Sequence, residues 1–217
     1  MHDWRAEWGY QALFSCCSSK KADVIILFNN TFTCQISRTY CDPGGRYIIC
    51  DLITNGKQLT LLQTTTTQLF LPRSLSGLAD FKCDEVIIGG DYNLVLDVEK
   101  DKKRGLAKTH KKSLEILNSY CEDIDLIDVW RIQNPEQRRF TWRQKNPEIQ
   151  CRLDFFLVSQ CTSCNSINTD IAPGYKTDHS LVTLQISTHN NMRGRGFWKL
   201  NTSFLKDEEY IRKYNPL

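Results

Sequence analysis

Short apolar runs rich in β-branched and aromatic residues recur along the chain, and polar turn sequences separate them. Runs of this kind predict β-strands, because a half-buried pleated surface favours such side chains. We expect strands at Val24–Phe28, Tyr47–Leu52, Leu59–Leu62, Val86–Ile88, Phe140–Trp142, Asp154–Val158 and Leu181–Ile186.

Turn sequences between the early runs indicate how the first strands connect. Asp42-Pro43-Gly44-Gly45 and Asn55-Gly56 combine residues that favour tight turns or a positive φ. We therefore expect the first three runs to form an antiparallel meander.

Helical periodicity is weaker and occurs in two segments. In Thr109–Glu122, the side chains of Leu114, Leu117 and Cys121 recur at helical spacing, and Leu69–Phe81 is a poorer candidate. Strands outnumber helices in this prediction. The mixture favours an α/β sandwich in which sheets carry the functional site and helices cover them.

The chain has 217 residues, of which 41% are hydrophobic, and this is enough for one domain with a core. It contains no apolar run of membrane-spanning length, and the N-terminus lacks the pattern of a signal peptide. We therefore expect a soluble intracellular protein without membrane contact, in the nucleus or the cytoplasm. The composition changes after about Thr188, so we expect a domain at 1–187 followed by a linker and a partial helix at 188–217.

Ten cysteines are spaced irregularly, and several, such as Cys50, lie inside apolar runs. This placement favours reduced, mostly buried thiols over a disulfide framework. Cys161 and Cys164 form a single CxxC pair, and a typical zinc site would need a second pair.

The net charge is +3, and the basic residues are unevenly distributed. Lysine and arginine crowd the segment 100–112, and a second basic stretch at 138–152 includes Phe140 and Trp142. Basic side chains beside aromatic rings suit a nucleic-acid backbone and a stacked base. The first segment, taken alone, fits a solvated surface loop equally well.

A first chemical motif, Gly89-Gly90-Asp91-Tyr92-Asn93, follows the predicted strand Val86–Ile88. In an extended segment, residues i and i+2 point the same way, so Asp91 and Asn93 could address one water or one phosphate oxygen. The glycines allow a turn and a close approach of a ligand. An Asx-type turn that only ends the strand is an equally good interpretation of this motif alone.

A second candidate is His179, which lies next to Asp178 at the start of an apolar run. Strand alternation predicts that the carboxylate of Asp154 is buried, and a buried carboxylate needs a partner such as an imidazole N–H. An aspartate that orients a histidine recurs in catalytic sites. A lone histidine is more often structural.

Three strings, in this order, resemble motifs of the endonuclease/exonuclease/phosphatase superfamily: "GDYN" at 90–93, "RLDFFL" at 152–157 and "TDHS" at 177–180. Together with "ILFNN", "FTWRQKNP" and "FWKLNTSFLKDEEYI", they make the chain similar to the apurinic-type endonuclease domain of non-LTR retrotransposon polyproteins, of the long interspersed element type. The similarity covers the chain from about Trp8 onward.

This resemblance implies a four-layer α/β sandwich that lacks its first strands, and a Mg²⁺-dependent nick in DNA. It makes Asp91 the water-activating aspartate and Asn93 its neighbour. It also makes Asp154 the carboxylate that orients the catalytic His179, and Asp178 the acidic residue near the metal.

The same resemblance implies DNA as the partner, and no protein partner can be inferred. Thr141 falls where relatives approach the DNA backbone. We expect the DNA-binding side chains to come from the second basic stretch, at Arg139, Thr141, Trp142, Arg143 and Arg152.

The chain departs from the family pattern at two places. The early motif whose glutamate is the principal metal ligand is not present, and Glu7 stands in a different setting. Thr65 replaces the tyrosine with which relatives contact the scissile phosphate. We therefore expect a catalytically inactive remnant of a retrotransposon endonuclease domain, truncated before its first strands, with exposed sheet edges. A nucleic-acid-binding remnant without catalysis and a still-active endonuclease remain alternatives.

Overall fold

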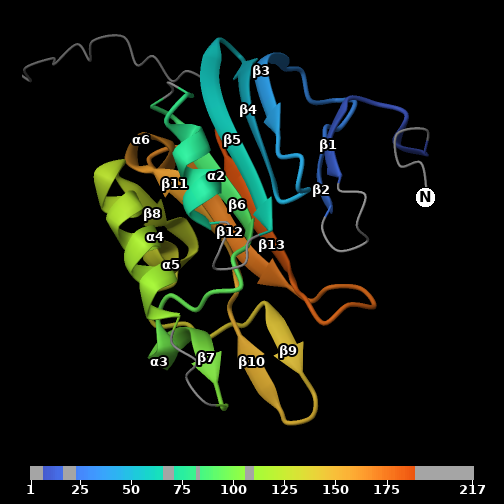
Figure 1. Cartoon of the computed structure of the whole chain (residues 1–217). Helices are drawn as coiled ribbons and strands as arrows, with labels where there is room; N and C mark the ends of the chain where they lie inside the picture. The colour runs from blue at the N-terminus through green and yellow to red at the C-terminus, as the bar shows by residue number, and fades with distance from the viewer. Residues whose placement is uncertain (1–6, 17–22, 66–70, 82–83, 106–109, 189–217) are drawn as a thin grey trace, which may run out of the picture.

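A mixed six-stranded sheet forms the centre of the computed structural model, which describes residues 7–16, 23–65, 71–81, 84–105 and 110–188 (Figure 1). Strands β5 and β6 are parallel, and the other neighbours are antiparallel. The strands, in spatial order, are β3 (Gln35–Cys41), β4 (Tyr47–Thr54), β5 (Lys57–Thr65), β6 (Val86–Asp91), β11 (Asp154–Ser159) and β8 (Leu126–Asp128).

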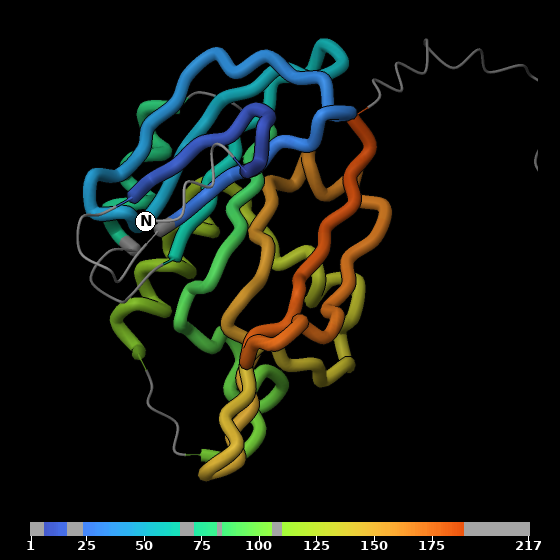
Figure 2. Tube along the Cα trace, turned by 90° about the vertical axis from the view of Figure 1, so that its right-hand side faces the viewer, coloured from blue at the N-terminus to red at the C-terminus, as the bar shows by residue number. Residues whose placement is uncertain are grey.

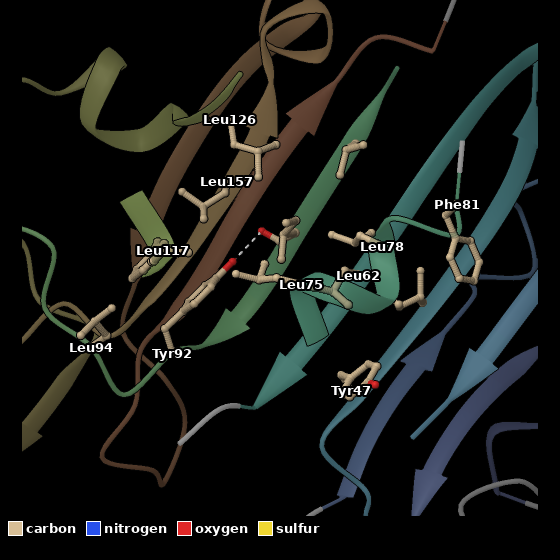
Figure 3. Close-up of a cluster of buried hydrophobic side chains, with 14 residues drawn as sticks. Tyr47, Leu62, Leu75, Leu78, Phe81, Tyr92, Leu94, Leu117, Leu126 and Leu157 are labelled. Atoms are coloured by element: carbon tan, nitrogen blue, oxygen red, sulfur yellow. Dashed lines mark hydrogen bonds between the residues drawn. The ribbon is translucent and has the colours of Figure 1, made fainter. Parts of the chain in front are cut away.

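Helices α2 (Leu71–Leu78) and α4 (Lys111–Asp123) cover one face of this sheet (Figure 1). Leucines from both helices pack there against alternate residues of the central strands, as Figure 3 shows. Within this core the ring of Tyr92 stacks on Phe155, with centroids 4.1 Å apart, and its hydroxyl donates to the carbonyl of Ile88. The tyrosine between Asp91 and Asn93 is therefore a core residue.

Two separate β pairs cover the opposite face: β1 (Ala12–Cys16) with β2 (Asp23–Leu27), and β12 (Ser166–Ala172) with β13 (Leu181–Ile186). Figure 2 shows the two pairs on the near side, with β6 and β11 visible between them. A second core lies under these pairs and consists of Phe28, Leu52, Leu59, Ile87, Val129 and Val158. The side chains of Ile87 and Ile88 point to opposite faces of the sheet, so β6 contributes to both cores.

Short elements complete the described structure. Helix α5 (Val129–Gln133) follows the edge strand β8, and helix α6 (Gln160–Ser163) follows its neighbour β11. A small sheet projects from the body and contains β7 (Lys102–Lys103), β10 (Ile149–Cys151) and β9 (Trp142–Gln144), next to helix α3 (Val98–Asp101) (Figure 1).

A buried group of ions connects this small sheet to the main sheet. Arg152, only 1% exposed, donates from Nε and Nη2 to the carboxylate of Asp101 at 2.8 Å each, and Nη2 also reaches Asp128 at 2.5 Å. Arg131 donates to the same Asp101 carboxylate. Attraction to Asp101 and Asp128 raises the pKa of the Arg152 guanidinium although burial alone would lower it.

The predicted strands are largely confirmed, and the connection of the early strands is corrected. The meander consists of β3, β4 and β5, because the run at Val24–Phe28 pairs with β1 in another layer. Residues 35–41 were not predicted as a strand since most of their side chains are exposed at the sheet edge. The turn at Asn55-Gly56 is confirmed, with both residues at positive φ.

One further predicted strand and the two predicted helices differ from the structure in their bounds, and one strand was not predicted. The run at Phe140–Trp142 becomes a strand only from Trp142, because Phe140 and Thr141 are buried before the small sheet begins. Both predicted helices exist, with shorter bounds, and β12 was missed.

The eight cysteines of the described ranges are free thiols, as predicted. Of these eight, Cys50 and Cys151 are buried and the others are partly or fully exposed, so the expectation of mostly buried thiols is wrong. No helix among the described residues is long and apolar enough to cross a membrane. The predicted linker and partial helix lie outside the described residues from 189 onward, as does part of the predicted helix at 69–81.

Candidate active site

Two carboxylates face each other at one end of the central sheet. Asp91 ends β6, Asp154 begins β11, and the two residues are direct partners in the antiparallel register. Their side chains project toward the second β layer, on the face where Ile87 and Val158 lie further along the same strands. Like charges directly opposite each other repel, so this pairing costs stability.

Asn93 holds the side chain of Asp91 in place. Its backbone N–H donates to Oδ1 of Asp91 at 2.9 Å, and its Nδ2 donates to Oδ2 at 3.1 Å. The residue has a φ of 48°, which asparagine tolerates better than most residues. The interpretation as an Asx-type turn therefore applies, and this turn orients the carboxylate of Asp91. Asn93 is not extended, so the geometry assumed for two parallel side chains does not hold.

His179 pairs with Asp154 as expected, but the Asp154 carboxylate is partly exposed and not buried as strand alternation predicts. Nδ1 of His179 lies 2.9 Å from Oδ2 of Asp154, and both side chains are partly exposed. His179 comes from the loop before β13, so the contact joins the second β layer to the central sheet. With Nδ1 toward Asp154, the other ring nitrogen, Nε2, is the atom that can approach a substrate.

The loop around His179 depends on a glycine that sequence reasoning missed. A Cβ at Gly174 would lie 2.1 Å from the backbone oxygen of His179 and 2.6 Å from a methyl carbon of Thr177. Only glycine permits this approach. The Pro173-Gly174 pair signalled a turn, but the sequence alone does not indicate that the turn packs on His179.

Thr141, Trp142 and Arg143 contact the same loop. A β-bridge joins Trp142 to His179, and Nε1 of Trp142 donates to Oδ2 of Asp178 at 3.0 Å. Arg143 donates through its backbone N–H to the carbonyl of Asp178 and through Nη1 to Oγ of Ser180. The side chain of Thr141 is fully buried beneath the loop.

The two other arginines predicted to bind DNA differ in position. Arg139 is partly exposed and pairs with Asp170 at 2.6 Å, while its other nitrogen donates to the carbonyl of Ile171. Arg152 lies inside the buried ion group described above, so its guanidinium is not at the surface. The guanidinium lies instead over the rings of Trp130 and Phe155.

Burial raises the pKa of Asp91 above its ordinary value, and the neighbouring charge of Asp154 raises it further. The hydrogen bonds from Asn93 and the proximity of His179 act in the opposite direction. A carboxylate with a raised pKa is a stronger base, so the site favours proton transfer at Asp91.

Asp91, Asp154 and His179 also form a group that could hold a metal ion, since their ligand atoms lie within 4.8 Å of one another. The two carboxylates suit a hard divalent cation, whereas an imidazole is a better ligand for transition metals. In the described part of the chain, this group includes neither Asp178 nor a glutamate.

The carboxylates of Asp91 and Asp154 line a groove of about 390 Å³ between β2 and β13. Its floor is formed by β5, β6 and β11, and its walls include Val24 and Val182. Thr65 lines the same groove and is the parallel partner of Asp91. The position where the resemblance expects a tyrosine is therefore next to the carboxylate pair.

Comparisons with known proteins agree with these motifs. No protein-family model matches the chain. The chain is 27% identical over 218 residues to the transposon TX1 uncharacterized 149 kDa protein of Xenopus laevis, covering 96% of this chain and 16% of that protein. The chain thus spans less than a fifth of the length of this relative.

Solved structures share the fold at low sequence identity. The AP endonuclease LMAP from Leishmania major has a TM-score of 0.66 at 15% identity, covering 82% of this chain and 70% of that one. The endonuclease domain of TRAS1, a telomere-specific non-LTR retrotransposon, has a TM-score of 0.61 at 14% identity, covering 81% and 79%. The 3'-5' exonuclease NExo from Neisseria meningitidis has a TM-score of 0.61 at 15% identity, covering 84% and 81%.

These findings confirm the resemblance to retrotransposon endonucleases of the endonuclease/exonuclease/phosphatase type. They also confirm the α/β sandwich of that superfamily as the fold of this chain.

Proposed function

We propose that the chain carries the phosphodiester-hydrolysing site of a retrotransposon-type DNA endonuclease, with its proton-transfer groups intact and its phosphate contact impaired. One observation carries this proposal: Asp154, which contacts His179, is the cross-strand partner of Asp91, which Asn93 holds, although these residues come from three different segments. The similarity to nucleases and to a transposon protein supports DNA as the substrate.

The residues divide the chemistry between them. Asp91, oriented by Asn93, accepts a proton from the attacking water. As the water oxygen bonds to phosphorus, the bond from phosphorus to the leaving oxygen breaks, and that oxygen takes its proton from solvent water. His179 approaches the phosphate through Nε2, while Asp154 fixes the ring through Nδ1. These roles need no movement of the backbone, because the four side chains already converge.

A divalent cation, Mg²⁺ by resemblance, would bind at the carboxylates of Asp91 and Asp154, with Asp178 on the adjacent loop. When bound, it neutralises phosphate charge and polarises the phosphorus–oxygen bonds. We infer that affinity for the ion is low, since Mg²⁺ prefers an oxygen cage and the group offers two carboxylates and an imidazole.

Thr65 is a second reason, besides the low affinity for the ion, for inferring that hydrolysis is weak or absent in the chain as it stands. Its short side chain lines the groove beside Asp91, where a tyrosine hydroxyl would reach several ångströms further. Loss of one positioned donor reduces turnover by roughly 10² to 10³. The Thr65→Tyr variant should therefore nick DNA faster than the unsubstituted chain.

The test measures Mg²⁺-dependent nicking of supercoiled plasmid by the unsubstituted chain, Thr65→Tyr and Thr65→Phe. We expect activity near background for the first, a gain of roughly 10² for the tyrosine variant and none for phenylalanine, which lacks the donor. Adding His179→Ala to Thr65→Tyr should abolish the gain. Nicking by the unsubstituted chain that His179→Ala eliminates would show that the site works without the tyrosine and would refute the proposed impairment.

A second candidate function is DNA binding without cleavage. It is favoured by the projecting small sheet, where the exposed side chains of Lys103 in β7 and Arg143 in β9 flank Gln150 of the central strand β10. Binding that weakens steeply between about 50 and 200 mM salt would support it. Binding unaffected by Arg143→Gln and Lys103→Gln together would contradict it.

A further inference from the structure

We propose that Thr141 is a positioning residue that sets the geometry of the Asp154–His179 pair. The effect of Thr141 on catalysis rests on the proposed function. Its effect on the geometry of the Asp154–His179 pair can be measured without any activity. It also reassigns a residue that sequence reasoning placed at the DNA backbone.

The hydroxyl of Thr141 holds the strand that carries Asp154. Its Oγ1 accepts from the backbone N–H of Leu153 at 2.8 Å and from that of Asp154 at 3.0 Å. The side chain is 0% exposed, so these contacts occur where water does not compete. A hydroxyl oxygen has two lone pairs and can accept both bonds, which a methyl group cannot.

The backbone of Thr141 holds the loop that carries His179. Its carbonyl accepts from the N–H of Ser180 at 2.6 Å, and its own N–H donates to the carbonyl of Cys151 at 2.9 Å. One residue therefore contacts the chain at Asp154 and directly after His179. The 2.9 Å contact between Nδ1 and Oδ2 spans the two segments that Thr141 joins.

The next two residues extend the same connection. Trp142 bridges to His179 and bonds Asp178, while Arg143 bonds Asp178 and Ser180. These contacts fix the loop, and of the three residues it is Thr141 that also bonds the backbone at Asp154, next to the pairing of β11 with β6. We therefore expect Thr141, among the three, to control the distance within the pair.

Two substitutions separate the hydroxyl from the volume. Thr141→Val keeps the shape and removes the acceptor, whereas Thr141→Ser keeps the acceptor and removes a methyl group. Thr162→Val is the matched control, because Thr162 is also a buried threonine whose hydroxyl is bonded, here to Ser159, in α6 at the far end of β11.

The experiment records the downfield proton signal and the tautomer of the His179 imidazole by nitrogen-labelled NMR. We expect the unsubstituted chain, Thr141→Ser and Thr162→Val to share one Nδ1–H signal, which Asp154→Asn removes. Thr141→Val should lose or shift that signal. If Thr141→Val does not fold, Thr141→Cys gives the same comparison, because a thiol is a weak acceptor.

The proposal is overturned if Thr141→Val or Thr141→Cys keeps the signal of the unsubstituted chain, or if Thr141→Ser loses it as well. Nicking is a separate readout, measured in the Thr65→Tyr background. There, Thr141→Val should reduce the rate by roughly 10²-fold, as expected for a misplaced catalytic group, and Thr141→Ser by only a few-fold. Absence of nicking in every variant would refute the proposed function and leave the NMR result to decide this inference.

Discussion

At the scale of single residues, the carboxylates of the site lower the stability of the fold but supply groups that can transfer protons. Asp91 and Asp154 are direct cross-strand partners of the same charge, and burial already raises the pKa of Asp91. Asn93 and His179 offset part of this cost through hydrogen bonds and charge. Residues that reduce stability in this way are typical of functional sites, where proton affinity matters more than the free energy of unfolding.

We predict that Asp91→Asn stabilises the fold at neutral pH, by roughly 0.5 to 2 kcal/mol. Because the folded-state pKa of Asp91 is raised, the native chain binds this proton more tightly than the unfolded chain. The carboxyl group of Asp91 therefore does not destabilise the fold at pH values below its pKa in the unfolded chain. The loss in free energy of unfolding grows as pH rises from that value to the folded-state pKa. Denaturant unfolding at pH 4 and pH 7 should show a larger gain at pH 7.

Asp123→Asn, at the exposed end of α4, is the control for removing a surface carboxylate. An equal gain at both pH values, or a gain matched by this control, would contradict the repulsion between Asp91 and Asp154. The same Asp91→Asn substitution should abolish any nicking in the Thr65→Tyr background, since the amide cannot accept the proton.

At the scale of elements, the sequence predicted best where one local pattern decided the structure. The runs at Val86–Ile88 and Asp154–Val158 became β6 and β11, and the structure pairs these strands with Asp91 opposite Asp154. The edge strand β3 escaped notice because its exposed residues carry no apolar alternation. Long-range contacts, such as Gly174 on His179, have no local pattern that could predict them.

Arg152 illustrates the same limit, because a basic residue in a basic stretch was taken for a DNA ligand. The structure buries it between α3, β8 and β11, paired with Asp101 and Asp128. The burial of Arg152 depends on two aspartates in other segments of the sequence. Asp101 is the last residue of α3, and Asp128 comes directly before α5.

We predict that Arg152→Met destabilises the fold by about 3 to 5 kcal/mol, since it leaves the buried carboxylate of Asp101 with only Arg131 as its cation. Adding Asp101→Asn should recover part of this loss. Arg139→Met is the matched control, because Arg139 pairs with Asp170 near the surface and should cost less than about 1 kcal/mol. Equal losses for both arginines in denaturant unfolding would contradict a special role of the buried group.

At the scale of the whole molecule, the second β layer is divided. Within the described residues, β2 pairs only with β1, and β13 pairs only with β12, so each has an edge toward the groove. Hydrogen-bonded strands lie about 4.8 Å apart. A groove of about 390 Å³ separates β2 from β13, so these two edges do not pair with each other. Backbone groups at such edges can pair with another chain.

We predict that the chain self-associates as its concentration rises toward the order of 100 μM, because the edge of β13 can extend a sheet with a second molecule. Thr183→Lys adds a charge to the exposed face of β13 and should shift the chain toward monomer in light scattering after size exclusion. Gln137→Lys adds the same charge at an exposed position outside the strands and should not. Equal self-association of the Thr183→Lys and Gln137→Lys variants would exclude the β13 edge as the cause. A chain that stays monomeric at every concentration would mean that the edges of β2 and β13 do not pair with another molecule.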